Sequence, residues 1–128
     1  MPRRTKAMEL LDFEIAFYER LANQYPEFID VLVPLGEAYS RRGLLEKGLA
    51  VDIKLTRLRE ADPIIWYNLA CSYSLLNRID DAVQAMRHAI QLGYDDVGHL
   101  RSDPDLANFR RNPVYRELME QLTQRQAV

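Results

Sequence analysis

The sequence predicts an all-α protein, and three observations point to that fold class. Apolar residues recur with helical spacing in most segments, and five glycines and six prolines separate these segments. No stretch of useful length alternates apolar and polar residues as a half-buried strand would. The sequence also matches itself after a shift of 34 positions, which predicts a stack of similar helical units.

The match at 34 positions joins residues of the same size class or the same conformational role. The pairs are Leu32/Trp66, Leu35/Leu69, Gly36/Ala70, Tyr39/Tyr73, Gly43/Asn77, Leu45/Ile79, Gly48/Ala82, Leu49/Val83 and Leu55/Ala89. The first four positions of each unit are spaced i, i+3, i+4 and i+7, which is one face of a helix. Gly43 and Asn77 both tolerate the left-handed conformation in which helices end. Each unit is therefore predicted to be a helical hairpin that buries its apolar face only by stacking.

These hairpins resemble tetratricopeptide (TPR) repeats, whose first helix carries the pattern W-x2-L-G-x2-Y. The second unit resembles the family at Trp66, Leu69, Ala70, Tyr73, Ala82, Met86 and Ala89, and the first at Leu35, Gly36, Tyr39 and Gly43. The resemblance implies a right-handed superhelix of antiparallel helical hairpins, a TPR solenoid, forming a single domain over 1–128. Its expected parts are a half repeat at 9–25, repeats at 28–61 and 62–93, and C-terminal capping helices in 94–128. The segment GYDDVGHLRSDPDL is similar to a tail that closes many small bacterial TPR proteins.

Local signals set the expected helix ends in the repeats. Pro34 removes one helical hydrogen bond, which predicts a kink or a late start of the first helix of repeat 28–61. The second helix of that repeat is expected to continue to Arg59. Asp62 and Pro63 predict the next helix start, as N-cap and first helical residue.

The cap contains three further helix starts. Asp95 and Asp96 are expected to begin a short helix after Gly93 ends the preceding one. Asp103-Pro104 and Asn112-Pro113 each place a capping residue before a proline at the first helical position. They predict helices at 104–110 and 113–124, which cover the apolar end of the last hairpin.

Asp52 occupies a position at which the pattern expects a large buried side chain, because Met86 and Tyr18 hold the matching positions. The favoured interpretation is a local change of helix register that leaves Asp52 partly exposed. The alternative is a buried carboxylate, which would need a partner. The candidate partners are Arg41, Arg42 and Lys54.

The composition disfavours several classes of function. The net charge is −2, and the one basic cluster is Arg3, Arg4 and Lys6 near the beginning, so no nucleic-acid partner is expected. No run approaches the ~18 apolar residues of a membrane-spanning helix, so no membrane partner is expected. The single cysteine cannot form an internal disulfide, which fits a cytoplasmic location.

Catalysis is the least favoured interpretation. Cys71 lies in the middle of a predicted helix, whereas a nucleophilic cysteine needs a base or a helix N-terminus to lower its pKa. His88 falls off the inward face of its helix. His99 has four aspartates nearby in sequence, but these are accounted for by helix starts, which leaves His99 without a necessary partner. A cysteine- or metal-dependent enzyme is therefore only the third hypothesis, and neither a catalytic residue, a metal nor a cofactor is predicted.

The TPR resemblance implies a non-enzymatic scaffold or adaptor that binds a peptide or a partner helix on its concave face. The first helices of the repeats would line that face with Asp30, Val33, Glu37, Ser40, Arg41, Ile64, Tyr67, Asn68, Cys71, Ser74 and Leu75. Some TPR relatives clamp a terminal carboxylate with lysines, arginines and asparagines, and only Asn68 has a counterpart here. That ligand is not expected, because Asp30 and Ile64 stand where a lysine would be needed.

Self-association is the alternative to a separate partner. Two and a half repeats leave much helix surface uncovered. A homodimer through Phe13, Phe17, Tyr18 and Phe28 would cover the end formed by the half repeat. The identity of a separate partner stays open.

Overall fold

The computed structural model describes residues 3–127, and within that range the chain forms helices and turns with no strand. The all-α class is therefore confirmed. The chain divides into two compact units, residues 1–58 and 59–128, and in each the helices pack against their neighbours along the chain. The expectation of a single domain over 1–128 stays a prediction.

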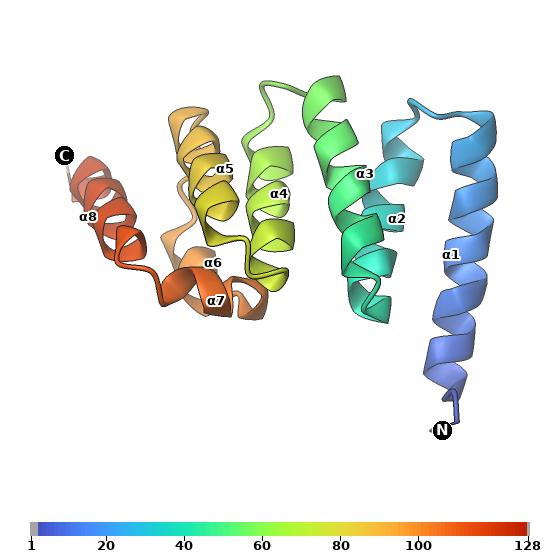
Figure 1. The fold of residues 1–128 in the computed structure, drawn as a ribbon. Coiled ribbons are helices and arrows are strands. Elements are labelled where there is room, and N and C mark those ends of the chain that lie inside the picture. The colour runs from blue at the N-terminus through green and yellow to red at the C-terminus, as the bar shows by residue number, and fades with distance from the viewer. Residues whose placement is uncertain (1–2, 128) are drawn as a thin grey trace. The chain divides into compact units, whose positions relative to one another are not determined.

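Unit 1 consists of three helices that follow one another in space as they do in sequence. They are α1 (Lys6–Gln24), α2 (Ile29–Arg42) and α3 (Leu45–Leu58), and α2 packs against both of the others (Figure 1). The side chain of Thr5 accepts a hydrogen bond from the amide of Met8 and so caps α1. Gly43 ends α2 with a left-handed φ of 81°.

One core cluster of unit 1 lies mainly between α1 and α2. It contains Ile15, Leu35, Ala38 and Tyr39, with Leu11, Tyr18, Ala22 and Val51 packed at its edge. Tyr39 donates a hydrogen bond to Glu19 across the helix pair, with an O–O distance of 2.5 Å. Asp12 accepts hydrogen bonds of 2.7 Å from Arg42 and Arg4, which lower the pKa of its carboxyl group.

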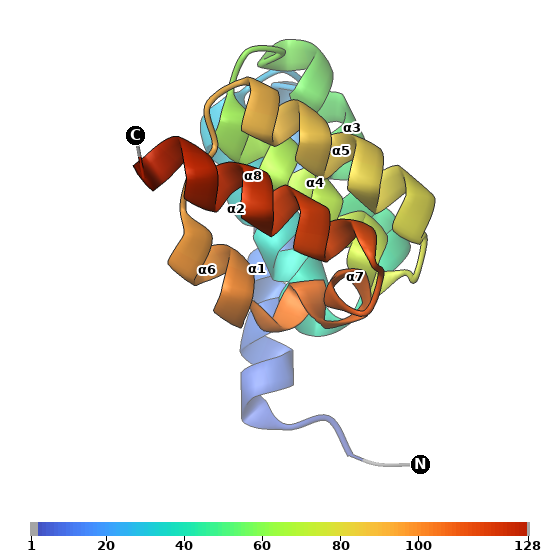
Figure 2. The ribbon, with the colours of Figure 1, turned by 90° about the vertical axis from the view of Figure 1, so that its left-hand side faces the viewer.

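Unit 2 consists of a second hairpin and the cap. The hairpin is α4 (Pro63–Leu75) and α5 (Ile79–Gln91). The cap is α6 (Val97–Ser102), the 3-10 turn η1 (Pro104–Leu106), α7 (Ala107–Arg110) and α8 (Val114–Ala127). Figure 2 shows α8 lying alongside α5, with α6 and α7 below it. The cap and the hairpin meet at large, fully buried side chains. These are Met86 of the hairpin and Leu100, Leu106, Phe109, Leu118 and Leu122 of the cap.

The helix ends follow the predicted chemistry. Asn77 has a φ of 57°, so it adopts the left-handed conformation of Gly43 at the matching position of the repeat. Asp62 accepts a hydrogen bond from the amide of Ile64, and Pro63 is the first helical residue. The cap uses the same device: Asp96, Asp103 and Asn112 each accept a hydrogen bond from a backbone amide at a helix start. These predictions are confirmed.

Five predicted boundaries need adjustment. In the cap, the segment predicted as one helix at 104–110 is divided into η1 and α7, and α8 spans Val114–Ala127 where 113–124 was predicted. Helix α1 begins at Lys6, three residues before the predicted 9, because Thr5 caps it there. Helix α2 begins at Ile29 with Pro34 inside it, so the predicted late start is wrong. Pro34 is the sixth residue of α2, so it removes the hydrogen bond to the carbonyl of Asp30 but does not end the helix. Helix α3 ends at Leu58, one residue before the predicted Arg59.

Asp52 is buried, so the expectation that it is partly exposed is wrong. It lies on α3 against α2, where Gly36 leaves room for it. A Cβ atom added to Gly36 would lie 3.3 Å from Oδ1 of Asp52. Gly36 on α2 and the short carboxylate of Asp52 on α3 are therefore sterically matched. The sequence pattern of a single helix does not show such a match, because the two residues lie on different helices.

Candidate functional site

The α4 face that was predicted to bind a partner is covered by the cap. Tyr67, Cys71 and Ser74 expose only 3%, 7% and 0% of their surface. Both η1 and α7 pack on α4. The Ser74 hydroxyl accepts a hydrogen bond of 3.1 Å from the amide of Phe109, and the Ser74 carbonyl accepts one of 3.0 Å from Asn108. The expectation that these three side chains line an open face is therefore corrected, because the chain itself occupies that face.

A polar cluster centred on Asp103 joins α4 to the cap. Oδ2 of Asp103 accepts a hydrogen bond of 2.5 Å from the Tyr67 hydroxyl and lies 3.6 Å from the Cys71 sulfur. Nε2 of His99 lies 3.2 Å from the same oxygen. The expectation that His99 has no partner is therefore wrong. The ring of Tyr94 stacks on Tyr67 at 4.4 Å and closes the cluster from the side.

The electrostatics of this cluster oppose nucleophilic chemistry. Burial raises the pKa of Cys71 well above its usual value, and the neighbouring charge of Asp103 raises it further. Burial is also the main cause that raises the pKa of Tyr67. The hydrogen-bond acceptor beside the thiol is a carboxylate and not an imidazole, so Cys71 stays protonated at neutral pH. The cluster fixes the cap on α4.

No group of three or more His, Cys, Asp and Glu side chains among the described residues is arranged to hold a metal ion. Asp96 and Asp103 are occupied in capping helices. Within residues 3–127, no helix is long and apolar enough to cross a membrane.

The rest of the predicted binding face is divided between exposed and half-buried residues. Glu37, Arg41 and Ile64 are exposed, as is Asp30. The half-buried members are Val33, Ser40, Asn68 and Leu75. Arg41 is paired with Glu14 of α1 at 3.1 Å, so its guanidinium already has a partner.

The most prominent exposed apolar surface lies on α1. Leu10, Phe13 and Phe17 expose 70%, 69% and 48% of their surface, and their spacing of i, i+3 and i+7 places them on one side of the helix. We call these three residues the α1 apolar face. The core residue Ile15 points to the opposite side of α1.

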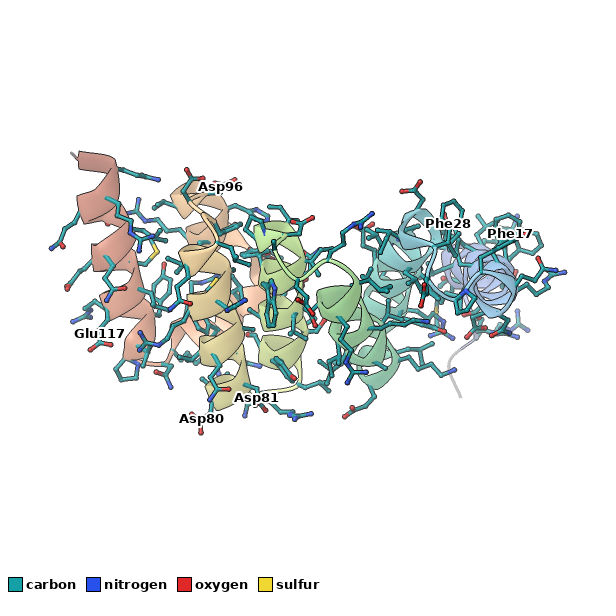
Figure 3. All side chains as sticks on the ribbon, turned by 90° about the horizontal axis from the view of Figure 1, so that it is seen from above. Phe17, Phe28, Asp80, Asp81, Asp96 and Glu117 are labelled. Atoms are coloured by element: carbon teal, nitrogen blue, oxygen red, sulfur yellow. The ribbon has the colours of Figure 1, made fainter. Side chains whose placement is uncertain are left out.

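Two aromatic side chains extend the exposed apolar surface at the turn into α2. Tyr25 and Phe28 are exposed and meet edge to face, with ring centroids 6.5 Å apart. Figure 3 shows Phe17 and Phe28 at the same end of unit 1. The sequence correctly indicated Phe13, Phe17 and Phe28 as uncovered, but it also included Tyr18, which packs against the core. It missed Leu10 and Tyr25, although the helical spacing of residues 10, 13 and 17 could have identified the first.

Opposite charges border the α1 apolar face. Glu9 lies near its N-terminal end and Arg20 near its C-terminal end, and both side chains are exposed. Neither forms an ion pair with another described residue. By contrast, Asp12 and Glu14, on the side facing α2, are both paired with arginines.

The comparisons with known proteins cover only part of the chain. No family model matches it. A curated protein of Arabidopsis thaliana, whose name marks it as chloroplastic, is 40% identical over 55 residues, which are 43% of this chain and 16% of that protein. The chain therefore matches this relative over about a sixth of the relative's own length.

Proposed function

We propose that the chain is a non-enzymatic protein-interaction module that self-associates through the α1 apolar face. The observation that carries this proposal is the exposure of Leu10, Phe13 and Phe17 along one side of a helix. Three large apolar side chains in a row on a protein surface are typical of an interface. The proposal combines the two functions expected from the sequence and favours the homodimer over the predicted concave face.

The TPR architecture is part of this proposal. It is supported by the two hairpins α2/α3 and α4/α5, whose matching residues Gly43 and Asn77 share a left-handed backbone. The small residues Gly36 and Ala70 are both buried where the two helices of each hairpin meet. Hairpins of this kind that stack on one another with a constant rotation form a right-handed superhelix, which is the architecture that we propose. A cytoplasmic location remains the expectation, with the chloroplast named for the Arabidopsis relative as the alternative.

The second copy is favoured as the occupant of the α1 apolar face by the charges that border it. In an antiparallel pair of α1 helices, Phe13 of one copy would meet Phe17 of the other. Glu9 would then lie close to Arg20 of the second copy at both ends of the contact. A parallel pair would bring like charges together, which opposes association. The charge pattern therefore favours an antiparallel, two-fold symmetric contact.

The area involved predicts modest affinity. Three large apolar side chains bury on the order of a few hundred Å² per copy, well below the roughly 800 Å² per partner of a standard protein–protein interface. Contacts of this size are typical of weak, reversible association.

Light scattering over a range of protein concentrations tests the proposal. The average mass of the wild-type protein is expected to rise with concentration, and that of Phe13→Asp/Phe17→Asp to stay monomeric. Leu44→Asp is the matched control, because Leu44 is exposed and apolar but lies outside the α1 apolar face. A wild-type protein that stays monomeric at its highest attainable concentration would overturn self-association.

A separate protein partner is the second candidate, and the exposure of Ile64 at the start of α4 favours it. Ile64→Asp would then weaken capture of that partner, while the thermal stability should stay unchanged. Tyr67 is not suitable for this test, because its truncation would open the junction between α4 and the cap.

A further inference from the structure

Unit 2 contains a hollow of about 590 Å³ that is lined by four arginines. Arg101 comes from α6, Arg110 from the end of α7, Arg111 from the turn that follows, and Arg116 from the first turns of α8. We call this hollow the arginine pocket. No aspartate or glutamate is among its described lining residues. Such a gathering of positive charge is unexpected in a chain whose net charge is −2.

The arginines of the pocket are not neutralised by described acidic residues, and one of them is fixed in place. Nη1 of Arg110 donates hydrogen bonds of 2.7 Å to the carbonyl of Asp103 and 3.2 Å to the carbonyl of Leu100, which fixes its guanidinium without using a carboxylate. Arg101, Arg111 and Arg116 form no ion pair with a described residue. Glu117, the acid next to Arg116, pairs instead with Arg87 at 3.8 Å.

The chemistry of the pocket suits an oxyanion. Guanidinium groups bind carboxylates and phosphate esters through two parallel hydrogen bonds. Like charges held close together repel each other, and a bound anion removes that cost. The pocket also lies at the start of α8, where the helix dipole adds positive potential.

The shape and lining of the pocket favour a peptide over a small anion. Its cations come from separate segments, and Arg101, Arg111 and Arg116 are exposed, so the hollow opens to solvent. Tyr115, Met119 and Pro113 form an apolar wall beside the arginines. We propose that the arginine pocket binds an acidic segment of a partner protein, whose carboxylate or phosphate-ester groups meet the guanidinium groups. None of the residues of the α1 apolar face takes part, so this proposal and self-association can fail separately.

Fluorescence anisotropy with labelled peptides tests this inference on the full chain. The probes are a short poly-glutamate peptide and a peptide of the same length with phosphoserines in place of the glutamates. Arg111→Gln/Arg116→Gln is expected to weaken binding of the better probe at least about tenfold, because it removes two guanidinium groups and their charge-assisted hydrogen bonds to the oxyanion. Arg57→Gln/Arg59→Gln is the control, because it removes the same charge from exposed positions that neither line the pocket nor pair with Glu117. This control is expected to weaken binding less than about twofold.

The outcomes distinguish binding of the peptide by the pocket arginines from a general attraction between an acidic peptide and positive charge. Tighter binding of the poly-glutamate peptide would identify carboxylates as the ligand groups, and tighter binding of the phosphoserine peptide would identify phosphate esters. Equal losses in the two variants would overturn the proposal, as would the absence of binding to either peptide. Inorganic pyrophosphate that binds as tightly as the peptides would assign the pocket to a small anion and overturn the peptide as ligand. A single-stranded oligonucleotide that binds more tightly than both peptides, with the same arginine dependence, would likewise overturn it. Circular dichroism of both variants checks that the helices are retained.

Discussion

At the scale of the residue, the Asp103 side chain contacts both the cap and the hairpin. Its Oδ1 atom caps η1 by accepting a hydrogen bond of 3.0 Å from the amide of Asp105. Its Oδ2 atom receives Tyr67 from α4 and lies against Cys71 and His99. Because the side chain is buried, each of these contacts replaces water that the carboxylate has lost. The residue that begins the cap is thus also the one that attaches it to the hairpin.

Replacing Asp103 by alanine should destabilise unit 2 by about 2–4 kcal/mol. The loss of the helix cap costs about 1 kcal/mol, and the Tyr67 hydroxyl left buried without its acceptor costs about 1–3 kcal/mol. Urea unfolding monitored by circular dichroism measures the change. Tyr67→Phe and the double variant complete a thermodynamic cycle, and the two changes are expected to be non-additive by about 1 kcal/mol. A cost below about 0.5 kcal/mol for Asp103→Ala would contradict this role.

The Cys71 thiol should be unreactive in the folded protein. Burial and the neighbouring carboxylate raise its pKa, so the reactive thiolate is scarce at neutral pH and remains so as the pH rises past the usual thiol range. A disulfide reagent at pH 7 is expected to react at least about a hundredfold more slowly with the native than with the urea-unfolded chain. Equal rates in the two states would revive the cysteine-enzyme hypothesis.

At the scale of the element, the sequence predicts the ends of the helices but not the contacts between segments that are distant in the chain. Helix ends depend on residues close together in the chain, so Asp62-Pro63, Asp103-Pro104 and Gly43 could be interpreted correctly. The contact between Tyr67 and Asp103 spans 36 positions and has no local signal, so Tyr67 was wrongly placed on an open face. The arginine pocket was missed for the same reason, because its residues lie on separate segments that only the folded cap brings together.

The end of α2 provides a direct test of the repeat. Gly43→Ala should destabilise unit 1 by about 1 kcal/mol, because alanine disfavours the positive φ found there, although the space around the position is open. Gly43→Asn should retain most of the stability, since asparagine already holds the matching conformation at Asn77. Thermal or urea unfolding of the two variants gives the comparison. Equal stability of the alanine and asparagine variants would argue that the two positions are not equivalent.

At the scale of the whole molecule, the protein offers two surfaces with different chemistry. The α1 apolar face belongs to unit 1 and is exposed among the described residues, whereas Tyr67, Cys71 and Ser74 of α4 in unit 2 are covered by the cap. The arginine pocket belongs to unit 2 and is polar. Asp80 and Asp81 lie at the start of α5 (Figure 3), where Asp81 pairs with Arg78 at 3.1 Å. The two surfaces share no residue.

Sedimentation equilibrium of charge-reversal variants tests the central claim, antiparallel self-association through α1, most directly. Glu9→Arg and Arg20→Glu should each shift the protein toward the monomer, because each brings like charges together in the antiparallel pair. The double variant should restore the wild-type dependence of mass on concentration, because it exchanges the two charges and keeps their pairing. A double variant that associates no better than the single variants, or a wild-type protein that is monomeric at every concentration, would contradict the account.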